Sequence, residues 1–483
     1  MSMNEAIRSM TLVIRDVLLF DGGGEPPVPS DVAIAGEYIT AIGAPGSLVG
    51  EHIVEANGLA LAPGFIDVHT HDDRALLIPG MMAAKLSQGV TTVITGNCGL
   101  SLAPAQMTNV PAPLDLIATP EWLRFPHFAD YLAELASSGI AVNAACMVGH
   151  TTLRASVMGD SLDRSASEDE CYRMRELLEE SLAAGAFGFS TGTFYPPARA
   201  ATLDEIVTVA EPLARYGAFY ATHMRNEAEA VLDSLEETYE IGRRLRVRVL
   251  ISHHKLAGVK NYGRSRETLA SIQAARDRQP VSLDCYPYNA SSTTLNPAFI
   301  ARAARVLVSW SAPYPQHAGR LLAEIAAEWG ISDEAAAQRL MPAGAIYFMM
   351  DEDDVQRILA FPTTMIGSDG MPHDEHPHPR LWSTFPRVLG HYSRELGLFP
   401  LHTAVNKMSG LPAAELGIDR RGRIAAGYYA DLVLFNPQTV KDSATFAQPR
   451  TRAEGIEKVW VNGHLAWDDG EIRHQTAGQV IHR

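Results

Sequence analysis

Long apolar runs and cysteine are the two features this sequence has least of. No stretch of its 483 residues approaches the ~20 consecutive apolar residues that a membrane helix needs. Its four cysteines are too few for a disulfide framework in so long a chain. Residues 1–10 carry charges without an uninterrupted apolar core, so we expect no signal peptide. We therefore expect a soluble protein, and the cytoplasm is the simplest location for it.

Basic residues are fewer than acidic residues in this chain. The chain has 40 Lys and Arg against 56 Asp and Glu, which gives a formal net charge of −16. Nucleic acids and anionic membranes bind basic surfaces, so we expect neither as a partner. A small anionic substrate is still compatible with this net charge, because a few cationic side chains in one pocket can make the local electrostatic potential positive. The sequence does not indicate the oligomeric state.

Two β-rich ends flank a long α/β middle. Short strand-like segments separated by turn residues occur at residues 12–20, 31–35, 430–435 and 459–463. We expect these ends to pair into one small β-sandwich domain, formed by residues 8–62 and 421–475. The chain would leave this domain at Pro63 and return to it near Arg421.

Between the ends, apolar strand-like runs alternate with helical segments, which favours a parallel sheet. The runs cover residues 62–68, 91–95, 141–148, 186–190, 218–222, 247–252, 281–286 and 364–367. Eight such runs predict an α/β fold of the (β/α)₈ TIM-barrel type over residues 63–420. The oversized connection before the last run contains a helical stretch, residues 318–340. We expect residues 289–345 to form a helical lid inserted in the barrel.

Metal-binding types of residue follow several of these runs. They are His69, His71, Cys98, His223, His253 and Asp369. In a barrel, the positions after the strands converge on the carboxyl-terminal mouth, where such folds place their active sites. Side chains two apart on a strand share a face, so His69 and His71 can address one ion. Imidazole, thiolate and carboxylate together form a zinc-like ligand set.

Other histidines in the chain have simpler explanations. A single buried His or Cys is usually a core residue, but convergence of several at one barrel mouth is hard to attribute to packing. His254 adjoins His253 and should face the opposite way, so we expect it to pack in the core. His373, His376 and His378 are interrupted by prolines and are typical of a loop.

Longer motifs resemble a known family. Residues 63–71, Pro-Gly-Phe-Ile-Asp-Val-His-Thr-His, resemble the opening signature of the amidohydrolase superfamily, and residues 427–435 resemble its return into a small β-domain. Four further motifs are similar to those of the D-aminoacylase (N-acyl-D-amino-acid deacylase) family. They are Thr-Gly-Asn-Cys-Gly at 95–99, Phe-Gly-Phe-Ser-Thr-Gly at 187–192, Ile-Ser-His-His-Lys at 251–255 and Ser-Asp-Gly at 368–370. The resemblance runs from about residue 11 to 465.

This resemblance implies roles for individual residues. Cys98, His223 and His253 would hold one tightly bound zinc ion, and Asp369 would be the proton shuttle. A second, weaker metal site would use His69, His71, Cys98 and Asp369. The α-carboxylate of the substrate would bind to Lys255, Tyr286, Ser292 and Arg380.

One departure from the wider superfamily is informative. Hydrolases of cyclic amides bridge two metals with a carboxylated lysine after the fourth strand, but here that strand ends in Ser190-Thr191-Gly192. The thiolate of Cys98 can supply the bridging charge instead. The pattern therefore favours linear N-acyl-D-amino acids as substrates over ring opening.

The preferred side chain is less sharply indicated. In N-acyl-D-glutamate deacylases an arginine follows the proline that matches Pro297, whereas this chain has Ala298-Phe299. Residues 310–315 and 342–347 nevertheless resemble the branch specific for acidic substrates. We give more weight to the pocket residue, and expect Phe299 to contact an apolar or neutral D-side chain.

Three alternatives stay open at this point. The first is deacylation of N-acyl-D-glutamate or N-acyl-D-aspartate. The second is hydrolysis of dipeptides with a C-terminal D-residue, which would use the same zinc and carboxylate clamp. The third, a metal-free scaffold, is disfavoured because Asp369 and every metal-type residue of the motifs are present.

Overall fold

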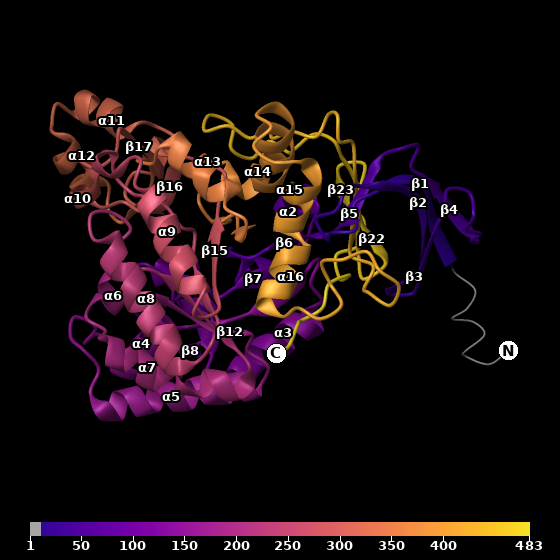
Figure 1. Ribbon diagram of the computed structural model, residues 1–483. Coiled ribbons are helices and arrows are strands. Elements are labelled where there is room, and N and C mark those ends of the chain that lie inside the picture. The colour runs from indigo at the N-terminus through magenta and orange to yellow at the C-terminus, as the bar shows by residue number, and fades with distance from the viewer. Residues whose placement is uncertain (1–10) are drawn as a thin grey trace.

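The computed structural model describes residues 11–483 (Figure 1). The expectation of no signal peptide concerns residues 1–10 and lies outside the described residues, as do residues 8–10 of the expected β-domain. Helices and a largely parallel set of strands make up most of the chain, and a separate sheet lies at one side. None of the described helices is both long and apolar enough to span a membrane.

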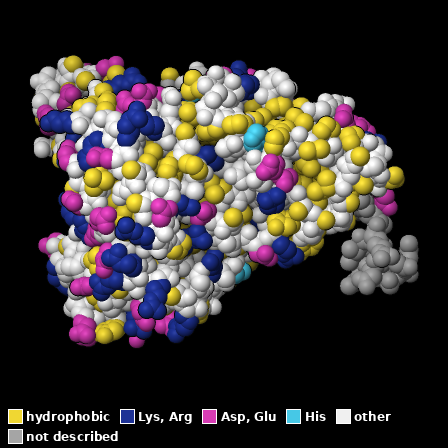
Figure 2. Space-filling view, in the orientation of Figure 1, with side chains coloured by type: hydrophobic (Ala, Val, Ile, Leu, Met, Phe, Trp, Pro, Cys, Tyr) yellow, Lys and Arg dark blue, Asp and Glu magenta, His cyan; other side chains and the backbone are white. Residues whose placement is uncertain are grey.

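The two ends of the chain share one nine-stranded sheet. Strand β5 is the junction, because it pairs in parallel with β1 and antiparallel with β20. The strands are β1 (Thr11–Leu19), β2 (Val28–Ala35), β3 (Tyr38–Gly43), β4 (His52–Glu55), β5 (Ala60–Pro63), β20 (Leu432–Phe435), β21 (Ile456–Val461), β22 (His464–Asp468) and β23 (Glu471–Ile472). Exposed apolar side chains gather over this sheet in Figure 2, and Val28, Ile42, Val49 and Ile53 are among them.

The first apolar run, residues 62–68, is divided between two sheets rather than forming one strand. Its start belongs to β5, and β6 (Phe65–Asp67) opens the parallel set. The division falls at Gly64, whose amide donates to the Asp431 carbonyl at 2.7 Å. A Cβ at Gly64 would lie 2.2 Å from the Thr91 side chain, so only glycine permits this close approach of backbone to the next strand.

Parallel strands form the centre of the molecule. They are β6, β7 (Val90–Thr95), β10 (Asn143–Cys146), β11 (Val148–Gly149), β12 (Gly188–Gly192), β13 (Phe219–His223), β14 (Val249–Ile251), β15 (Val281–Cys285) and β19 (Thr364–Ile366). Strands β6, β7 and β10 form one sheet and the other six form a second. Every residue of these strands is buried, as expected for strands covered on both faces.

Backbone hydrogen bonds join the two parallel sheets at both edges. At one edge, the Met147 amide donates to the Thr95 carbonyl at 3.0 Å and the Phe187 amide to the Cys146 carbonyl at 2.8 Å. At the other edge, the Asp369 amide donates to the His69 carbonyl at 2.7 Å. The bond from Asp369 to His69 holds the segments after β6 and β19 together, and both segments carry predicted site residues.

The helices follow the strands along the chain. They are α2 (Ala83–Leu86), α3 (Phe128–Ser138), α4 (His150–Met158), α5 (Glu168–Ala183), α6 (Pro196–Arg199), α7 (Leu203–Ala210), α8 (Val231–Leu245), α9 (Ser265–Arg276), α13 (Glu352–Ala360), α14 (Arg380–Arg387), α15 (Leu401–Met408) and α16 (Gly410–Leu416). Helix α5 begins with a capping box in which Ser167 and Glu170 bond each other's backbone amides. In α8, a Cβ at Gly242 would lie 2.2 Å from Val249, so glycine lets this helix pack closely on β14.

The connection between β15 and β19 is not purely helical, contrary to the sequence-based expectation. It contains an antiparallel sheet of β16 (Ala290–Thr294), β18 (Ala343–Phe348) and β17 (Arg305–Ser311), besides α10 (Pro297–Ile300), α11 (Leu322–Trp329) and α12 (Asp333–Leu340). The apolar residues of β17 and β18 favour strands here because nearly every residue of both strands is buried. The predicted helix over residues 318–340 is broken at Gly330, which adopts a left-handed conformation with φ 67°.

The C-terminal tail reaches the amino-terminal ends of the parallel strands. The Gly478 amide donates to the Ile140 carbonyl, and the Ile481 amide donates to the Ala144 carbonyl at 2.8 Å. Ile481 packs on an apolar cluster that includes Phe187, Phe219 and Leu416. This cluster therefore closes the end of the strands opposite the predicted site.

Candidate functional site

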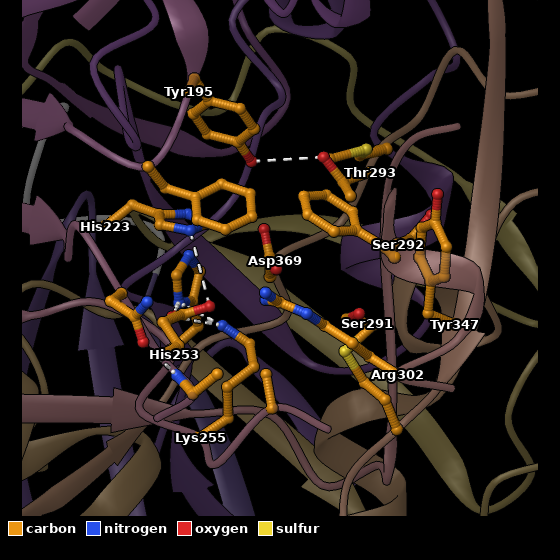
Figure 3. Close-up of a pocket in the computed structure, with 18 residues that line it drawn as sticks. Tyr195, His223, His253, Lys255, Ser291, Ser292, Thr293, Arg302, Tyr347 and Asp369 are labelled. Atoms are coloured by element: carbon orange, nitrogen blue, oxygen red, sulfur yellow. Dashed lines mark hydrogen bonds and ion pairs between the residues drawn. The ribbon is translucent and has the colours of Figure 1, made fainter. Parts of the chain in front are cut away.

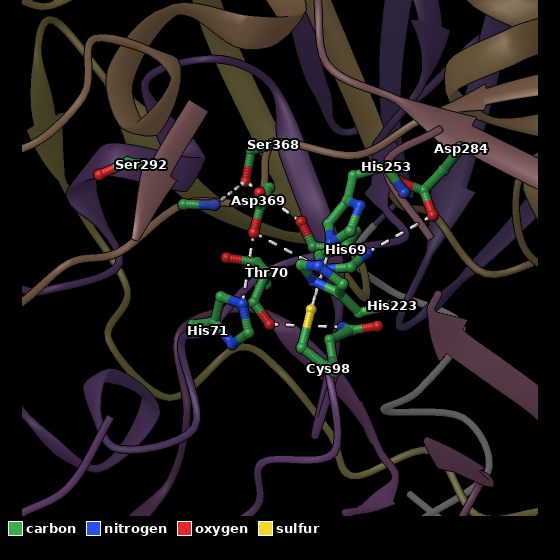
Figure 4. A network of polar contacts seen from close by, with 12 residues as sticks. His69, Thr70, His71, Cys98, His223, His253, Asp284, Ser292, Ser368 and Asp369 are labelled. Carbon is green, nitrogen blue, oxygen red and sulfur yellow. Dashed lines mark hydrogen bonds and ion pairs between the residues drawn. The ribbon is translucent and has the colours of Figure 1, made fainter. Parts of the chain in front are cut away.

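The structure brings the predicted metal-type residues together after the carboxyl ends of their strands (Figure 4). His69 and His71 follow β6, and Cys98 follows β7. His223 is the last residue of β13, His253 follows β14, and Asp369 follows β19. All six side chains are buried. The strand-end pattern in the sequence thus corresponds to one compact cluster.

The Cys98 thiol lies at the centre of this cluster. Its Sγ is 3.3 Å from His69 Nε2 and 3.4 Å from His253 Nε2, and the His223 and His253 rings are 4.4 Å apart. Burial alone would raise the pKa of Cys98, but the His69 and His253 rings lower it, and the net pKa lies well below its usual value. The thiolate is the form that binds a metal ion.

Three groups of buried residues could each hold a metal ion, since their donor atoms lie within 4.8 Å of one another. They are His69, Cys98 and His253; His69, His71 and Asp369; and His223, Glu227 and His253. Within residues 11–483, neither ring nitrogen of His223 has a hydrogen-bond partner, although the side chain is buried. Buried imidazole nitrogens normally have a partner, and a metal ion would provide one here. The donor set therefore fits a metal ion.

The backbone at the cluster is strained. Three of the buried side chains stand on a left-handed backbone that non-glycine residues seldom adopt: Cys98 with φ 55°, His253 with φ 36° and Asp369 with φ 49°. Such conformations persist only where the surroundings enforce them, and they concentrate at functional sites. Near Cys98, a Cβ at Gly96 would lie 2.1 Å from the Met147 carbonyl oxygen. Only glycine therefore lets this turn lie so close to the neighbouring strand.

Asp369 joins the metal-type cluster to a cation. One carboxylate oxygen lies 3.3 Å from His71 Nε2 and 3.6 Å from His69 Nε2, and the other is 2.9 Å from the Arg380 guanidinium. Burial raises the pKa of Asp369, but Arg380 and His71 outweigh burial and hold it well below the usual range. The carboxylate is thus charged and positioned between donor groups on both sides.

The predicted carboxylate-binding residues divide into two groups around Tyr286. Arg380 lies over the Tyr286 ring at 4.5 Å, and Lys255 lies over it at 5.7 Å. Among the described residues, the buried hydroxyls of Tyr286 and Ser292 have no hydrogen-bond partner. Figure 3 shows Ser292 and Lys255 on opposite sides of the pocket, with Asp369 between them. Arg380, Tyr286 and Ser292 can therefore act together, whereas Lys255 approaches from the other side.

Glu227 and Asp284 are site residues that the sequence reasoning missed. The Glu227 carboxylate lies 2.7 Å from Lys255 Nζ and 3.1 Å from His253 Nδ1. Asp284, on β15, accepts a hydrogen bond from the His253 amide at 2.9 Å and lies 3.5 Å from His69 Nδ1. Both carboxylates orient imidazoles that face the cluster, as outer-shell carboxylates commonly do. The available signals were a Glu four residues after His223 and an Asp within the seventh apolar run.

The other histidines and cysteines lie apart from this cluster. His254 is buried and bonds Thr268, which confirms its predicted packing role. His373 contacts Arg74, and His376 contacts the Phe446 carbonyl, both from the loop before α14. Cys98 is the single cysteine that takes part in a metal-type group of the described residues.

A cavity of about 60 Å³ adjoins the cluster. Asp369, His223 and His253 line its polar side. Its apolar side includes Phe299, which lies 5.4 Å from the Phe194 ring and 6.0 Å from the Tyr347 ring. Arg302 also lines the cavity (Figure 3), and its guanidinium lies 5.9 Å from the centre of the Phe299 ring.

Comparisons with known proteins agree with this arrangement. Residues 52–279 and 302–466 match the amidohydrolase family. The chain is 56 % identical to a D-aminoacylase of Alcaligenes xylosoxydans xylosoxydans over 98 % of this chain and 97 % of that one. It is 51 % identical to an N-acyl-D-aspartate deacylase of the same organism, over 99 % of this chain and 96 % of that one.

Solved structures show the same relationship. The fold superposes on a D-aminoacylase crystal structure with a TM-score of 0.96 at 55 % identity, covering 98 % of this chain and 100 % of that one. An N-acyl-D-glutamate deacylase from Bordetella bronchiseptica, complexed with zinc and a phosphonate mimic of the tetrahedral intermediate, gives 0.94 at 41 % identity with the same coverage. The chain therefore belongs to the amidohydrolase family, within its D-aminoacylase branch, and is an α/β hydrolytic enzyme.

Proposed function

We propose that this protein uses bound zinc to hydrolyse the amide bond of N-acyl-D-amino acids, giving a carboxylate and a free D-amino acid. The observation that carries the proposal is the position of Asp369. Its carboxylate lies between the imidazoles around Cys98 on one side and Arg380 on the other. A metal-type cluster, a proton-transferring group and a cation for a carboxylate are thus in direct contact with one another. The N-acyl-D-amino-acid deacylases among the relatives support the same reaction.

The tight zinc site in this proposal consists of Cys98, His223 and His253. A second, weaker site would share Cys98 and use His69, His71 and Asp369. Zinc held there would supply a Lewis acid that polarises the scissile carbonyl and acidifies water. The glutamate deacylase structure with zinc supports this choice of metal.

Asp369 transfers the proton in this mechanism. It accepts a proton from the attacking water and donates it to the departing nitrogen, since an amine leaves poorly unless protonated. Its carboxylate is in position to do so because it lies 3.3 Å from His71 Nε2, at the edge of the metal-type cluster. Arg380 holds the second carboxylate oxygen at 2.9 Å and so fixes the direction in which the first oxygen points.

Binding of the α-carboxylate falls mainly to Arg380, Tyr286 and Ser292. Arginine has five donors in a planar fork, so Arg380 can contact Asp369 and a substrate carboxylate together. The buried hydroxyls of Tyr286 and Ser292 have a free donor to offer. Lys255 is held by Glu227 at 2.7 Å and adds positive charge from across the Tyr286 ring.

The architecture that we propose for this reaction is a (β/α)₈ barrel over residues 63–420. The backbone bonds at both edges of the two parallel sheets support closure of the strands into one barrel. Residues 289–345 form the lid over its mouth, and residues 8–62 and 421–475 form the small β-sandwich domain.

The wall of Phe299, Tyr347 and Phe194 favours an apolar or neutral D-side chain. Arg302 supports a second candidate function, deacylation of acidic D-amino acids, because it lines the same cavity. Arg302 lies just after α10. The N-acyl-D-aspartate deacylase relative supports the same alternative.

The proposal is tested with matched enantiomers. We expect kcat/KM for N-acetyl-D-methionine to exceed that for the L-enantiomer, and chelation of the metal to abolish both. Arg380→Ala should lower kcat/KM by an amount equivalent to about 2–5 kcal/mol, as for loss of a buried charge-assisted contact. Equal rates on D and L substrates, or indifference to Arg380→Ala, would contradict the assignment. Adding N-acetyl-D-aspartate to the panel decides between the two side-chain preferences.

A further inference from the structure

A second, larger hollow lies directly beyond the substrate cavity. This outer groove has a volume of about 250 Å³, against about 60 Å³ for the cavity at Asp369. Phe194, Tyr195 and Phe299 line both spaces and so form an aromatic wall between them. The two spaces are therefore neighbouring parts of one substrate region, separated only by side chains.

The outer groove is built mainly from apolar side chains of distant segments. Pro113 and Leu295 line it together with Trp310 and Met341. The Trp310 indole packs against β18 at Gly344, where a Cβ would lie 2.3 Å from Nε1. The Met341 side chain is 45 % exposed, so it lies at the open side of the groove.

Charge is restricted to two residues of the groove. Arg199 donates a hydrogen bond to the Phe194 carbonyl at 3.1 Å and is otherwise exposed. Asp115 is partly buried, and this burial raises the pKa of its carboxyl group. Neither residue forms a clamp comparable to that of Arg380, Tyr286 and Ser292. The groove therefore suits an aliphatic chain rather than a second charged group.

The position of the aromatic wall indicates which end of a substrate faces the groove. The His223 ring lies 5.0 Å from the Phe194 ring and 4.9 Å from the Tyr195 ring. The wall therefore adjoins the metal-type residues, where the scissile carbonyl would lie. Figure 3 shows Tyr195 and His223 on one side of Asp369, with Ser292 and Tyr347 on the other. With the carboxylate held on the Ser292 side, the acyl carbon points towards the wall.

We propose that the outer groove is an acyl-binding subsite, and that the enzyme accepts N-acyl-D-amino acids with medium-length aliphatic acyl groups. The acyl chain crosses the edge of the wall formed by Phe194, Tyr195 and Phe299 and lies against Trp310 and Met341 in the groove. This inference rests on the proposed function, because it places the same scissile amide at the same residues. Each methylene group buried in the groove should raise kcat/KM by up to about fourfold.

The test compares N-octanoyl-D-methionine with N-acetyl-D-methionine. We expect the unmodified enzyme to favour the octanoyl substrate by about tenfold or more in kcat/KM, because several methylene groups are buried. Met341→Glu and Trp310→Ser should each lower the octanoyl-to-acetyl ratio by about tenfold, since one adds a charge beside the chain and the other removes apolar surface. Leu396→Glu is the matched control, because Leu396 is 48 % exposed and lies outside the groove. It should leave the ratio unchanged.

Three outcomes would overturn the inference or its basis. An octanoyl-to-acetyl ratio that is the same in all four proteins would show that the chain does not lie in the groove. If Met341→Glu instead impaired N-acetyl-D-2-aminodecanoate selectively, the groove would hold the D-side chain and not the acyl group. Hydrolysis of neither N-acetyl- nor N-octanoyl-D-methionine would contradict the proposed function itself, since the acetyl group is too short to reach the groove.

Discussion

At their carboxyl ends the parallel strands carry ionisable side chains, whereas at their amino ends they enclose an apolar cluster. At the first end, Cys98, His253 and Asp369 stand on strained backbone, each at a cost of about 1–3 kcal/mol. At the other end, Phe187 and Leu416 are almost fully buried, and such side chains contribute about 1.5–3 kcal/mol each. The comparison suggests that apolar packing at one end offsets the strain that chemistry requires at the other.

The largest effect that this comparison predicts is at the centre of the cluster. Cys98→Ala should abolish both metal binding and activity, because Cys98 is shared by the two proposed metal sites. The folded state should survive, since the apolar cluster at the opposite end is untouched. Metal analysis, circular dichroism and kcat on N-acetyl-D-methionine measure the three properties.

Cys171→Ala is the matched control for this variant. Cys171 is buried in α5 and takes no part in a metal-type group. Its replacement should leave the metal content unchanged. A Cys98→Ala protein that kept a full equivalent of zinc and normal turnover would contradict the ligand assignment.

The next effect concerns proton transfer. Asp369→Asn should lower kcat by about 100-fold or more, because the amide keeps the shape of the side chain but cannot accept a proton. Zinc at the tight site should be largely retained, since that site is formed by Cys98, His223 and His253. Steady-state kinetics measures the loss of kcat, and metal analysis measures the zinc that is retained.

Asp419→Asn is the control, because the Asp419 side chain is 86 % exposed. A near-normal kcat in Asp369→Asn would show that another group moves the proton.

The same comparison explains what the sequence could predict. His69, His71, Cys98 and Asp369 were found because metal-type residues followed apolar runs, and parallel strands bring such positions to one edge. The pairing of the chain ends followed from matching strand patterns. These features depend on local periodicity and on strand direction, which a single sequence records.

Other features depend on contacts that leave no local pattern. Lys85 becomes visible only in three dimensions, where it bonds Asp67 at 2.6 Å. For Glu227, the spacing after His223 alone does not show that this carboxylate joins Lys255 to His253. Two strands of the inserted segment were missed because β16 reads Ala-Ser-Ser-Thr-Thr and β18 begins Ala-Gly-Ala, and such small residues are typical of loops as well. Nothing in residues 478–483 indicated that this tail packs on strand ends more than 300 residues earlier in the chain.

The smallest effect on catalysis is predicted at the amino ends of the strands. Leu416 ends α16, is 1 % exposed and belongs to the cluster with Phe187, Phe219 and Ile481. Leu416→Ala should lower the free energy of unfolding by about 2–5 kcal/mol, since it removes buried methyl groups and leaves a cavity. The kcat and KM of the folded enzyme should not change, because Leu416 adjoins the amino ends of the strands, where its neighbour Glu415 accepts a hydrogen bond from Ser282 at the start of β15. Urea unfolding, followed by tryptophan fluorescence, measures the stability. Kinetics at low temperature on the same preparation measure kcat and KM.

Leu396→Ala is the control. Because Leu396 is 48 % exposed, its replacement should change the free energy of unfolding by less than about 0.5 kcal/mol. If Leu416→Ala raised KM or lowered kcat as Asp369→Asn does, the two ends of the strands would be coupled, and the division between chemistry and packing would be wrong.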